Sequence, residues 1–290
     1  MSFVVAIDGP AGAGKGTITE LVGKQVGLVN IDTGATFRCV TLAMIKHNIG
    51  LDEEEKIKEL LAKINIEIKN EQGKQNVYLD GEEVTKQIRE KQVNDLVSPV
   101  STLKLVRTNL LNLQRKMAEG KDIIMEGRDI GTTVFPDAQV KIFLTATAEE
   151  RARRRVKQNQ EKGIETTYEE SLANIKARDK MDSERKVAPL QQAKDAIYLD
   201  STNMSIPEVV DKIVKIIEQK RIESVYEVGL PSYLQHDIDQ FVEGEKVQSH
   251  LLDCYANELY GSINSAYYSD EITEDQANYL RHKYLIKENK

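Results

Sequence analysis

The chain has few of the residues that mark secreted, metal-binding or membrane proteins. Its 290 residues include no tryptophan, two cysteines and four histidines that form no cluster. Cys39 and Cys254 stand far apart and in no metal-ligand spacing, so we expect two reduced, buried thiols rather than a disulfide framework or a zinc site. No apolar run is long enough to span a membrane, and no basic segment precedes an apolar core. We therefore expect a cytoplasmic protein with no membrane partner.

The chain also lacks a stripe of basic residues. It has 40 Lys and Arg against 47 Asp and Glu, a net charge of −7. This balance argues against a nucleic-acid partner. The charge is uneven, because residues 222–290 hold only five basic residues but 13 acidic ones, and eight of the eleven tyrosines. The shift predicts a boundary near Arg221–Pro231, between a domain at 1–221 and an acidic, tyrosine-rich region at 222–290.

A glycine-rich loop near the start is the strongest functional signal. The loop, Gly9–Thr17, follows the apolar run Phe3–Ile7 and opens a segment with helical periodicity. Glycines let backbone N–H groups turn toward an anion, and the positive end of the helix dipole favours negative charge there. Lys15 is expected to reach the β- and γ-phosphates of a nucleotide, and the Thr17 hydroxyl is placed for Mg²⁺. The common form of this motif has Ser or Thr directly after the lysine, whereas here Gly16 comes first.

Apolar strand-like runs alternate with amphipathic helical segments across residues 1–221. We expect strands at 3–8, 28–31, 123–125, 140–144 and 197–199, and helices at 15–26, 33–47, 53–63, 98–119, 148–160, 168–180 and 206–221. Strict alternation at Ile64–Ile68 and again at Asn76–Leu79, across a turn at Gly73, predicts a small β hairpin. The pattern as a whole predicts an α/β fold with a parallel sheet covered by helices on both faces.

Polar segments follow two of the expected strands. Asp32–Arg38 comes after the second strand and Glu126–Gly131 after the third. Because ligands of such sheets bind at the carboxyl ends of the strands, we expect both segments beside the glycine loop. Glu126 is placed to orient a water on Mg²⁺. Simpler interpretations stay open for four residues: Asp32 as a cap of the strand end, Glu126 as a turn residue, and Arg128 with Asp129 as a structural ion pair.

With these segments in view, the chain resembles a bacterial-type cytidylate kinase over roughly residues 3–220. The resemblance rests on Asp8–Thr17, Asp32–Arg38, Glu126–Asp137, the strand Val140–Leu144 with the arginine-rich helix after it, and Ala177–Leu190. It implies a P-loop α/β kinase that transfers a phosphoryl group from ATP, with Mg²⁺, to CMP or dCMP. It also implies a β insertion in the monophosphate-binding region at about 64–90 and a mobile lid at about 148–165.

The resemblance also implies two nucleotide sites. The ATP site comprises Gly9, Pro10, Ala11, Gly12, Ala13, Gly14, Lys15, Gly16 and Thr17. For CMP, the phosphate site comprises Arg38, Arg128 and Arg185, the base site Ser98, Arg107 and Asp129, and the sugar site Arg178 and Asp182, with Thr33 where many relatives carry Ser. Lys15, Arg128 and Arg185 are the expected catalytic residues. Arg151, Arg154 and Arg155 are candidates for phosphate contact from the lid, with solvated surface charge as the alternative.

An Asp/Arg pair is chemically suited to cytosine. The base offers an amino donor at N4 and acceptors at N3 and O2, which match a carboxylate and a guanidinium. Uracil has an oxygen at position 4, which would face the carboxylate with no proton between them. An unpaired buried polar group costs about 1–3 kcal/mol, which gives about tenfold or greater discrimination. Two alternatives stay open: a kinase for UMP, AMP or a non-nucleotide alcohol, and a nucleotide-binding regulator or adaptor with residues 222–290 as its effector module.

Residues 222–290 lie outside the resemblance, and we call them the extension. We expect a helix from Ser232 to about Val242 that ends before Gly244, and a second at Glu245–Tyr267. A third should begin at a capping box, Thr273 with Gln276, and run to about Lys287. Apolar and tyrosine residues recur at helical spacing in Leu251, Leu252, Tyr255, Leu259 and Tyr260. This spacing predicts packing within the extension or onto the kinase domain, with self-association or an unknown protein partner as the alternative.

Overall fold

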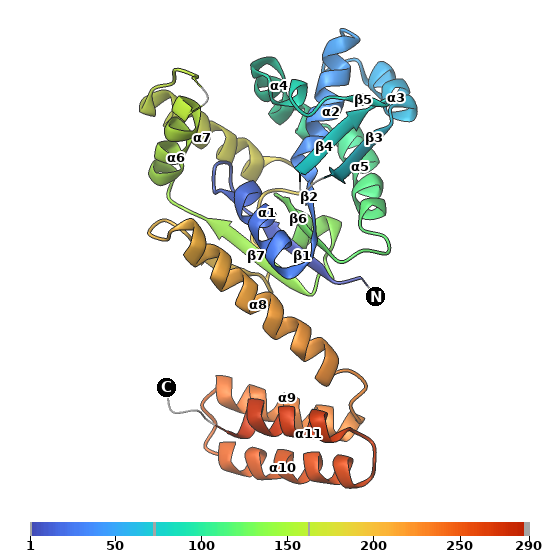
Figure 1. Cartoon of the computed structure of the whole chain (residues 1–290), viewed down its shortest axis with the longest axis vertical. Coiled ribbons are helices and arrows are strands. Elements are labelled where there is room, and N and C mark those ends of the chain that lie inside the picture. The colour runs from blue at the N-terminus through green and yellow to red at the C-terminus, as the bar shows by residue number, and fades with distance from the viewer. Residues whose placement is uncertain (1, 72–73, 162, 287–290) are drawn as a thin grey trace. The chain divides into compact units, whose positions relative to one another are not determined.

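The computed structural model describes residues 2–71, 74–161 and 163–286 (Figure 1). The chain forms two compact units, Met1–Ile217 and Glu218–Lys290. The boundary between them lies a few residues before the expected one at Arg221–Pro231. In the part of the chain that the structure describes, no helix is both long and apolar enough to cross a membrane.

The first unit is built on a five-stranded parallel sheet with the order β2-β6-β1-β7-β8. Its strands are β1 (Val4–Asp8), β2 (Val29–Asp32), β6 (Ile123–Gly127), β7 (Val140–Thr145) and β8 (Ile197–Asp200). Strand β1 is central and all five of its residues are buried. Alternate side chains enter the cores on the two faces, which is why the strand reads as a continuous apolar run. The predicted parallel sheet is confirmed.

Helices cover both faces of this sheet. On one face, α1 (Lys15–Val26) and the first part of α8 (Ile206–Tyr226) pack on the sheet. On the other face, α5 (Lys104–Met117) and the turn Ile130–Val134 contribute to the core. A further core joins α2 (Thr33–Lys46), α3 (Glu54–Lys63) and α4 (Lys91–Thr102) to α5. The glycine loop follows the central strand and therefore lies between neighbouring strand ends.

The predicted hairpin forms a small antiparallel sheet beside this further core. Strand β3 (Ile66–Glu71) pairs with β4 (Lys74–Leu79), and a short strand that was not predicted, β5 (Glu82–Glu83), pairs with β4. The Gln75 amide donates a 2.8 Å hydrogen bond to the backbone oxygen of Asn30 in β2. The hairpin is thus tied to the edge of the main sheet. Gly73, the predicted turn residue, lies outside the described residues.

The single helix predicted at 98–119 was wrong, because the chain forms two helices there. Helix α4 ends at Thr102, Leu103 is extended, and α5 starts at Lys104. The Ser101 and Thr102 hydroxyls donate to the backbone oxygens three residues earlier, at 2.8 and 2.7 Å. Such bonds compete with the helix ladder and favour its end. Ser98 and Arg107 therefore come from different helices.

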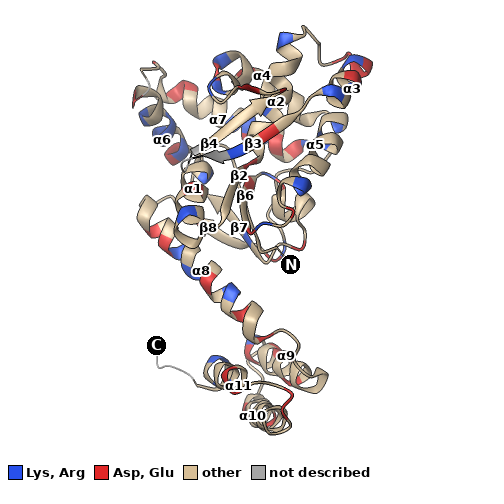
Figure 2. Cartoon of the chain, turned by 45° about the vertical axis from the view of Figure 1, so that its right-hand side comes forward, with Lys and Arg blue, Asp and Glu red and all other residues tan. Residues whose placement is uncertain are grey.

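The predicted lid segment, at about 148–165, contains the first of two helices that follow β7. Helix α6 (Ala148–Glu161) carries the arginine-rich sequence, and Figure 2 shows its basic residues in blue. Helix α7 (Tyr168–Glu184) begins at a capping box, in which Thr167 and Glu170 exchange side-chain and backbone hydrogen bonds. The α7 helix is longer than predicted, so that it carries both Arg178 and Asp182 near its C-terminal end.

The second unit is helical, as predicted. It contains the last turns of α8, then α9 (Ser232–Lys246), α10 (Leu252–Tyr268) and α11 (Glu274–Leu280), which begins at the predicted capping box. Side chains from α9, α10 and α11, with Ile272, form a separate core. Lys283 forms ion pairs with Glu223 and Glu227 at 3.0 and 2.7 Å, and Tyr226 stacks on Tyr279. The end of α8 is therefore part of this unit.

Some details of the extension were predicted wrongly. Gly244 does not end a helix but lies buried within α9, where an added Cβ would meet the Tyr255 ring at 2.8 Å. Glycine is needed there for close helix packing rather than as a breaker. Leu259 is buried as expected, but Leu251 and Tyr260 are 41% and 53% exposed. Cys254 is also exposed, unlike the buried Cys39. Lys287, the expected end of the third helix, lies outside the described residues.

Candidate active site

The glycine loop is shaped by close contact with the neighbouring strand. Gly9 has φ +153°, and a Cβ there would lie 1.9 Å from the backbone oxygen of Leu144 in β7. Only glycine lets the chain leave β1 along this path. Lys15 is the first residue of α1 and is buried. Its Nζ donates to the backbone oxygens of Gly9 and Pro10 at 2.8 and 2.9 Å. The ammonium is therefore held over the loop.

Burial sets the electrostatics of this loop. It lowers the pKa of Lys15, and the nearby Arg128 lowers it further, whereas Glu126 and Asp8 oppose the change. Burial also raises the pKa of Glu126, with a further contribution from Asp32. A bound polyanion would restore the preference of Lys15 for its charged form, since an opposite charge nearby favours ionisation. The loop is thus arranged for a ligand that carries negative charge.

Glu126 lies close to the glycine that follows the lysine of the loop. A Cβ at Gly16 would lie 3.1 Å from Glu126 Oε1, so a side chain there would require the carboxylate to shift by a few tenths of an ångström. The Thr17 hydroxyl and the Glu126 carboxylate are oxygen donors, which Mg²⁺ prefers. Among the described residues, no three His, Cys, Asp or Glu side chains form a metal site by themselves. The donors that are present fit an ion held mainly by nucleotide phosphates.

A second cluster of charges surrounds Asp129, at the end of β6. Its Oδ2 accepts a hydrogen bond from Arg107 of α5, and its Oδ1 lies 3.1 Å from Arg185 Nη2. The three side chains are all buried. The predicted carboxylate–guanidinium pair is therefore assembled from segments far apart in the sequence. Arg107 also lies over the Phe37 ring, 5.4 Å from its centroid.

Arg128 does not pair with Asp129, so the structural ion pair left open from the sequence is not present. Arg128 Nε donates to Asp182 Oδ2 at 2.8 Å. Asp182 also lies 3.7 Å from Arg185. The two carboxylates, Asp129 and Asp182, thus hold three arginines together at the end of β6 and α7. This arrangement brings together five of the residues predicted for CMP.

Arg38 and Arg178 add further positive charge. Arg38 Nη1 lies 3.4 Å from Asp32 Oδ2, and Asp32 caps α2 by accepting from the Ala35 N–H at 3.2 Å. Burial, followed by the nearby Arg128, lowers the pKa of Arg178 to about 10. In the described part of the chain, the Nε atoms of Arg38 and Arg178 are buried without a hydrogen-bond partner. Such orphaned donors are expected where an anionic ligand completes the site.

The two predicted hydroxyls have different surroundings. Thr33 Oγ1 donates to the backbone oxygen of Glu126 at 2.7 Å, which joins the start of α2 to the end of β6. Ser98 is buried in α4. Thr33 is thus already engaged with the main chain, so that its contact with a ligand stays a prediction.

The arginines of the lid segment have distinct positions. Arg151 is buried and its guanidinium contacts the backbone oxygens of Ala11 and Ala146 and the carboxylate of Asp179, each at 2.8 Å. Arg154 bonds to Ser201 and to Glu150. Arg155 differs, because burial and the charge of Arg38 lower its pKa. All three candidates have protein partners: Arg151 and Arg154 bond to residues outside α6, whereas Arg155 donates to Gln158 of the same helix at 2.9 Å.

Asp8 is a residue to which the sequence analysis gave no role. It is the last residue of β1 and is buried. Its two carboxylate oxygens accept hydrogen bonds from the backbone N–H groups of Ile130 and Gly131, at 2.8 and 2.7 Å. Burial raises its pKa to about 6 despite these bonds. The signal available in the sequence was an acidic residue ending an apolar strand directly before the glycine loop.

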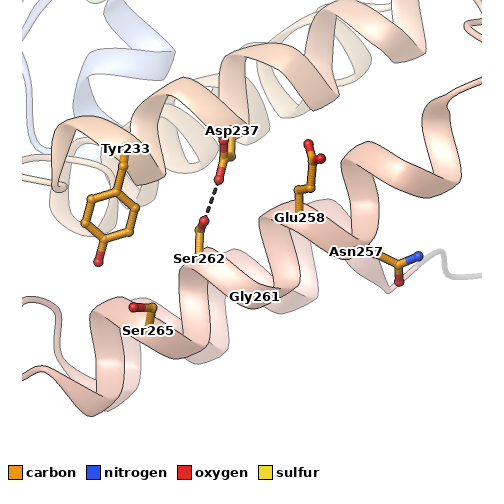
Figure 3. A pocket seen from close by; sticks show the side chains of 7 residues that line it. All are labelled: Tyr233, Asp237, Asn257, Glu258, Gly261, Ser262 and Ser265. Carbon is orange, nitrogen blue, oxygen red and sulfur yellow. Dashed lines mark hydrogen bonds between the residues drawn. The ribbon is translucent and has the colours of Figure 1, made fainter.

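Neither of two surface hollows is lined by a predicted nucleotide-binding residue. One, of about 320 Å³, lies beside the segment 134–138. The other, of about 350 Å³, lies between α9 and α10 of the second unit (Figure 3). It is lined by Tyr233, Asp237, Asn257, Glu258, Gly261, Ser262 and Ser265. Asp237 accepts a hydrogen bond from Ser262, so this carboxylate is already engaged across the hollow.

Comparisons with known proteins agree over the first unit. A family model described as cytidylate kinase matches residues 5–219. A cytidylate kinase of Fusobacterium nucleatum subsp. nucleatum is 48% identical over 218 residues, 75% of this chain and 98% of the relative. One from Caldicellulosiruptor saccharolyticus is 51% identical over 73% of this chain and 94% of the relative. One from Bacillus subtilis (strain 168) is 44% identical over 74% and 96%. The residues after 219 lie outside the family match.

Proposed function

The chain belongs to the cytidylate kinase family, and on that premise we propose that it transfers the γ-phosphoryl group of ATP to CMP or dCMP, giving ADP and CDP or dCDP. The best support for CMP as the acceptor is the buried cluster in which Asp129 pairs with Arg107 and Arg185. It follows β6, the strand that pairs with β1, and β1 leads into the glycine loop. The Asp129 cluster suits the base and phosphate of one nucleotide, while the glycine loop suits the phosphates of a second nucleotide.

Catalysis on this proposal depends on alignment and charge rather than on covalent chemistry. Lys15 neutralises the β- and γ-phosphates of ATP, while Arg128 and Arg185 hold the acceptor phosphate and the charge that develops on the moving group. Mg²⁺, which Thr17 and a water on Glu126 would help to hold with the phosphates, supplies further positive charge when bound. The ion pairs with Asp182 and Asp129 fix the direction of the two guanidinium forks.

Base selection follows from the same cluster. The Asp129 carboxylate accepts from the cytosine amino group and Arg107 donates to its ring acceptors, with Ser98 of α4 as a further proposed contact. In the free protein Asp129 and Arg107 bond to each other, so that neither is left unpaired when buried. Arg178 and Asp182 serve the sugar, and Arg38 serves the phosphate.

The segment at about 148–165, which contains α6, is the proposed lid. Arg155 is its best candidate for phosphate contact, since its hydrogen bond goes to Gln158 of the same helix, whereas Arg151 and Arg154 bond to residues outside α6. Arg151 instead donates a hydrogen bond to the backbone oxygen of Ala11, which connects the lid segment to the glycine loop. Closure would exclude water and so suppress hydrolysis of ATP. A cytoplasmic location is proposed from the reduced cysteines and from these soluble small-molecule substrates.

Initial rates with equimolar CMP, dCMP, UMP and AMP test the acceptor directly. We expect CMP and dCMP to give the highest rates, with UMP about tenfold or more slower because its position-4 oxygen faces a carboxylate. A higher rate with UMP or AMP would end the cytosine assignment and leave a kinase for another acceptor. ATP binding without CMP-dependent ADP formation would instead support the regulator alternative, which predicts no transfer.

We propose that the extension acts separately from catalysis, through self-association or contact with another protein. It has its own core, and none of the proposed nucleotide-binding residues falls in it. Ending the chain after Arg221 removes Glu223, Glu227 and their partner Lys283 together. Lys220, which also pairs with Glu223, stays behind but is exposed.

The chain ending at Arg221 is expected to keep kcat/KM for CMP within about twofold of the full chain. Steady-state kinetics and light-scattering mass measure the outcome. A mass that falls from a multiple of the protomer to a single protomer would assign the extension to self-association. A loss of activity above tenfold would show that the extension supports the active site, contrary to this proposal.

A further inference from the structure

One turn of the main chain connects the two proposed nucleotide sites. Asp8 stands directly before Gly9 of the glycine loop, and its carboxylate accepts from the two N–H groups that directly follow Asp129. The strand that leads into the ATP loop therefore bonds to the backbone that carries the base-reading residue. An added Cβ on Gly131 would lie 3.4 Å from Asp8 Oδ2, so the backbone comes close to the carboxylate.

The same turn is fixed at its far end by other residues. Arg115 donates from Nε to the backbone oxygen of Val134 at 2.9 Å and from Nη2 to that of Thr133 at 3.0 Å. Lys141 donates to the backbone oxygen of Pro136 and pairs with Asp195 at 2.7 Å. These contacts hold residues 133–136, whereas the Asp8 carboxylate binds the backbone N–H groups of Ile130 and Gly131, directly after Asp129. The turn thus offers two distinguishable supports, one near the base site and one remote from it.

We propose that Asp8 is a positioning residue for the acceptor nucleotide, which fixes the Ile130–Gly131 backbone and thereby the direction of the Asp129 carboxylate. The inference rests on the proposed function, in which Asp129 reads the base. Asp129 has two oxygens that serve Arg107 and Arg185 separately. A rotation of the Asp129 backbone would break one of these contacts. The hydrogen bonds from the Ile130 and Gly131 N–H groups to Asp8 prevent that rotation, so that Asp129 keeps one oxygen on Arg107 in the base site and the other on Arg185 in the phosphate site.

Replacing Asp8 by asparagine tests these two hydrogen bonds with little change of side-chain volume. Its amide has one oxygen for one of the two N–H groups, while its own NH₂ meets the other donor. We expect Asp8→Asn to raise KM for CMP about tenfold or more, since a lost hydrogen bond to a charged group is worth about that factor. The preference for CMP over UMP should fall, and KM for ATP should stay within about twofold.

Arg115→Ala is the matched control, because it loosens the same turn at its remote end. It should lower thermal stability while leaving KM for CMP and the CMP-to-UMP ratio within about twofold. Equal losses of ATP and CMP affinity in Asp8→Asn, or a change in Arg115→Ala as large as that in Asp8→Asn, would overturn the positioning role and leave Asp8 as a general structural residue.

Hydrogen exchange of the wild-type chain keeps the inference testable if Asp8→Asn does not fold. The amides of Ile130 and Gly131 should be protected without ligand and exchange still more slowly with CMP than with ATP. Free exchange of both amides, or equal slowing by ATP and CMP, would contradict it. If the wild type prefers another monophosphate, the cytosine assignment fails. The role of Asp8 is then still tested by comparing exchange of the two amides with that monophosphate bound and with ATP bound.

Discussion

Replacing Lys15 by alanine is expected to lower kcat by about 100- to 1000-fold, the cost of removing one preorganised group from a developing anion. The lysine is buried over the glycine loop, and no other lysine of the described chain hydrogen-bonds to that loop. KM for CMP should change little, since the acceptor phosphate is assigned to Arg38, Arg128 and Arg185. Steady-state kinetics with ATP and CMP varied separately measure both constants.

Lys24→Ala provides the control for this substitution. Lys24 lies in the last turn of the same helix, α1, and is exposed. Its loss removes one positive charge from α1 without touching the loop, and turnover should stay near wild type. Normal turnover in Lys15→Ala would refute the phosphate role of Lys15, and a CMP-specific defect would move Lys15 to the acceptor site.

Asp129→Asn is expected to have the other large effect. It removes the charge shared by Arg107 and Arg185, whose side chains are only 8% and 3% exposed. Breaking a buried ion pair in this way costs about 3–5 kcal/mol because the partners stay buried and uncompensated. We expect kcat/KM for CMP to fall by at least 100-fold, while ATP binding measured by calorimetry stays within about threefold.

Asp137→Asn is the matched control for this second prediction. Asp137 follows the same turn but is exposed, so its neutralisation should leave both activity and thermal stability nearly unchanged. Equal losses of CMP and ATP binding in Asp129→Asn would show that Asp129 holds the fold rather than the base. Unchanged use of CMP would remove Asp129 and Arg107 from base recognition.

Local chemistry was enough to predict the glycine loop, the strands of the parallel sheet and the capping box at Thr273. An apolar run in a parallel sheet is buried on both faces, so β1 could be recognised from five residues alone. The capping box depends on two side chains three residues apart, and both of its bonds are present. These features depend on near neighbours in the chain, which the sequence displays directly.

Features that depend on distant contacts were missed or wrong. Gly244 was predicted to end a helix, but it lies within α9, where the Tyr255 ring of the next helix occupies the space that a side chain would need. The break at Leu103 depends on hydroxyl bonds that compete with the helix. Helix propensity is a weak guide in both places, since tertiary packing and side-chain hydrogen bonds override it.

The residues of the site could be predicted from the sequence, but their hydrogen-bond and ion-pair partners within the protein could not. The resemblance picks out Arg128 and Asp129 as neighbours in the sequence, whereas the fold gives each a partner from elsewhere. Arg151 reads as one of several lid arginines, but its contact with Ala11 spans 140 residues. Asp8 is likewise bonded to groups 122 and 123 residues away. No local pattern encodes such pairings.

A crystal structure with CMP and a non-hydrolysable ATP analogue bound together tests the central claim most directly. That claim is that guanidinium groups from α2, the end of β6 and the end of α7 form an acceptor pocket next to the glycine loop. We predict Arg38, Arg128 and Arg185 on the CMP phosphate, with Lys15 on the β- and γ-phosphates of the analogue. A CMP phosphate bound away from these three arginines, or an ATP analogue bound away from Lys15, would contradict the account.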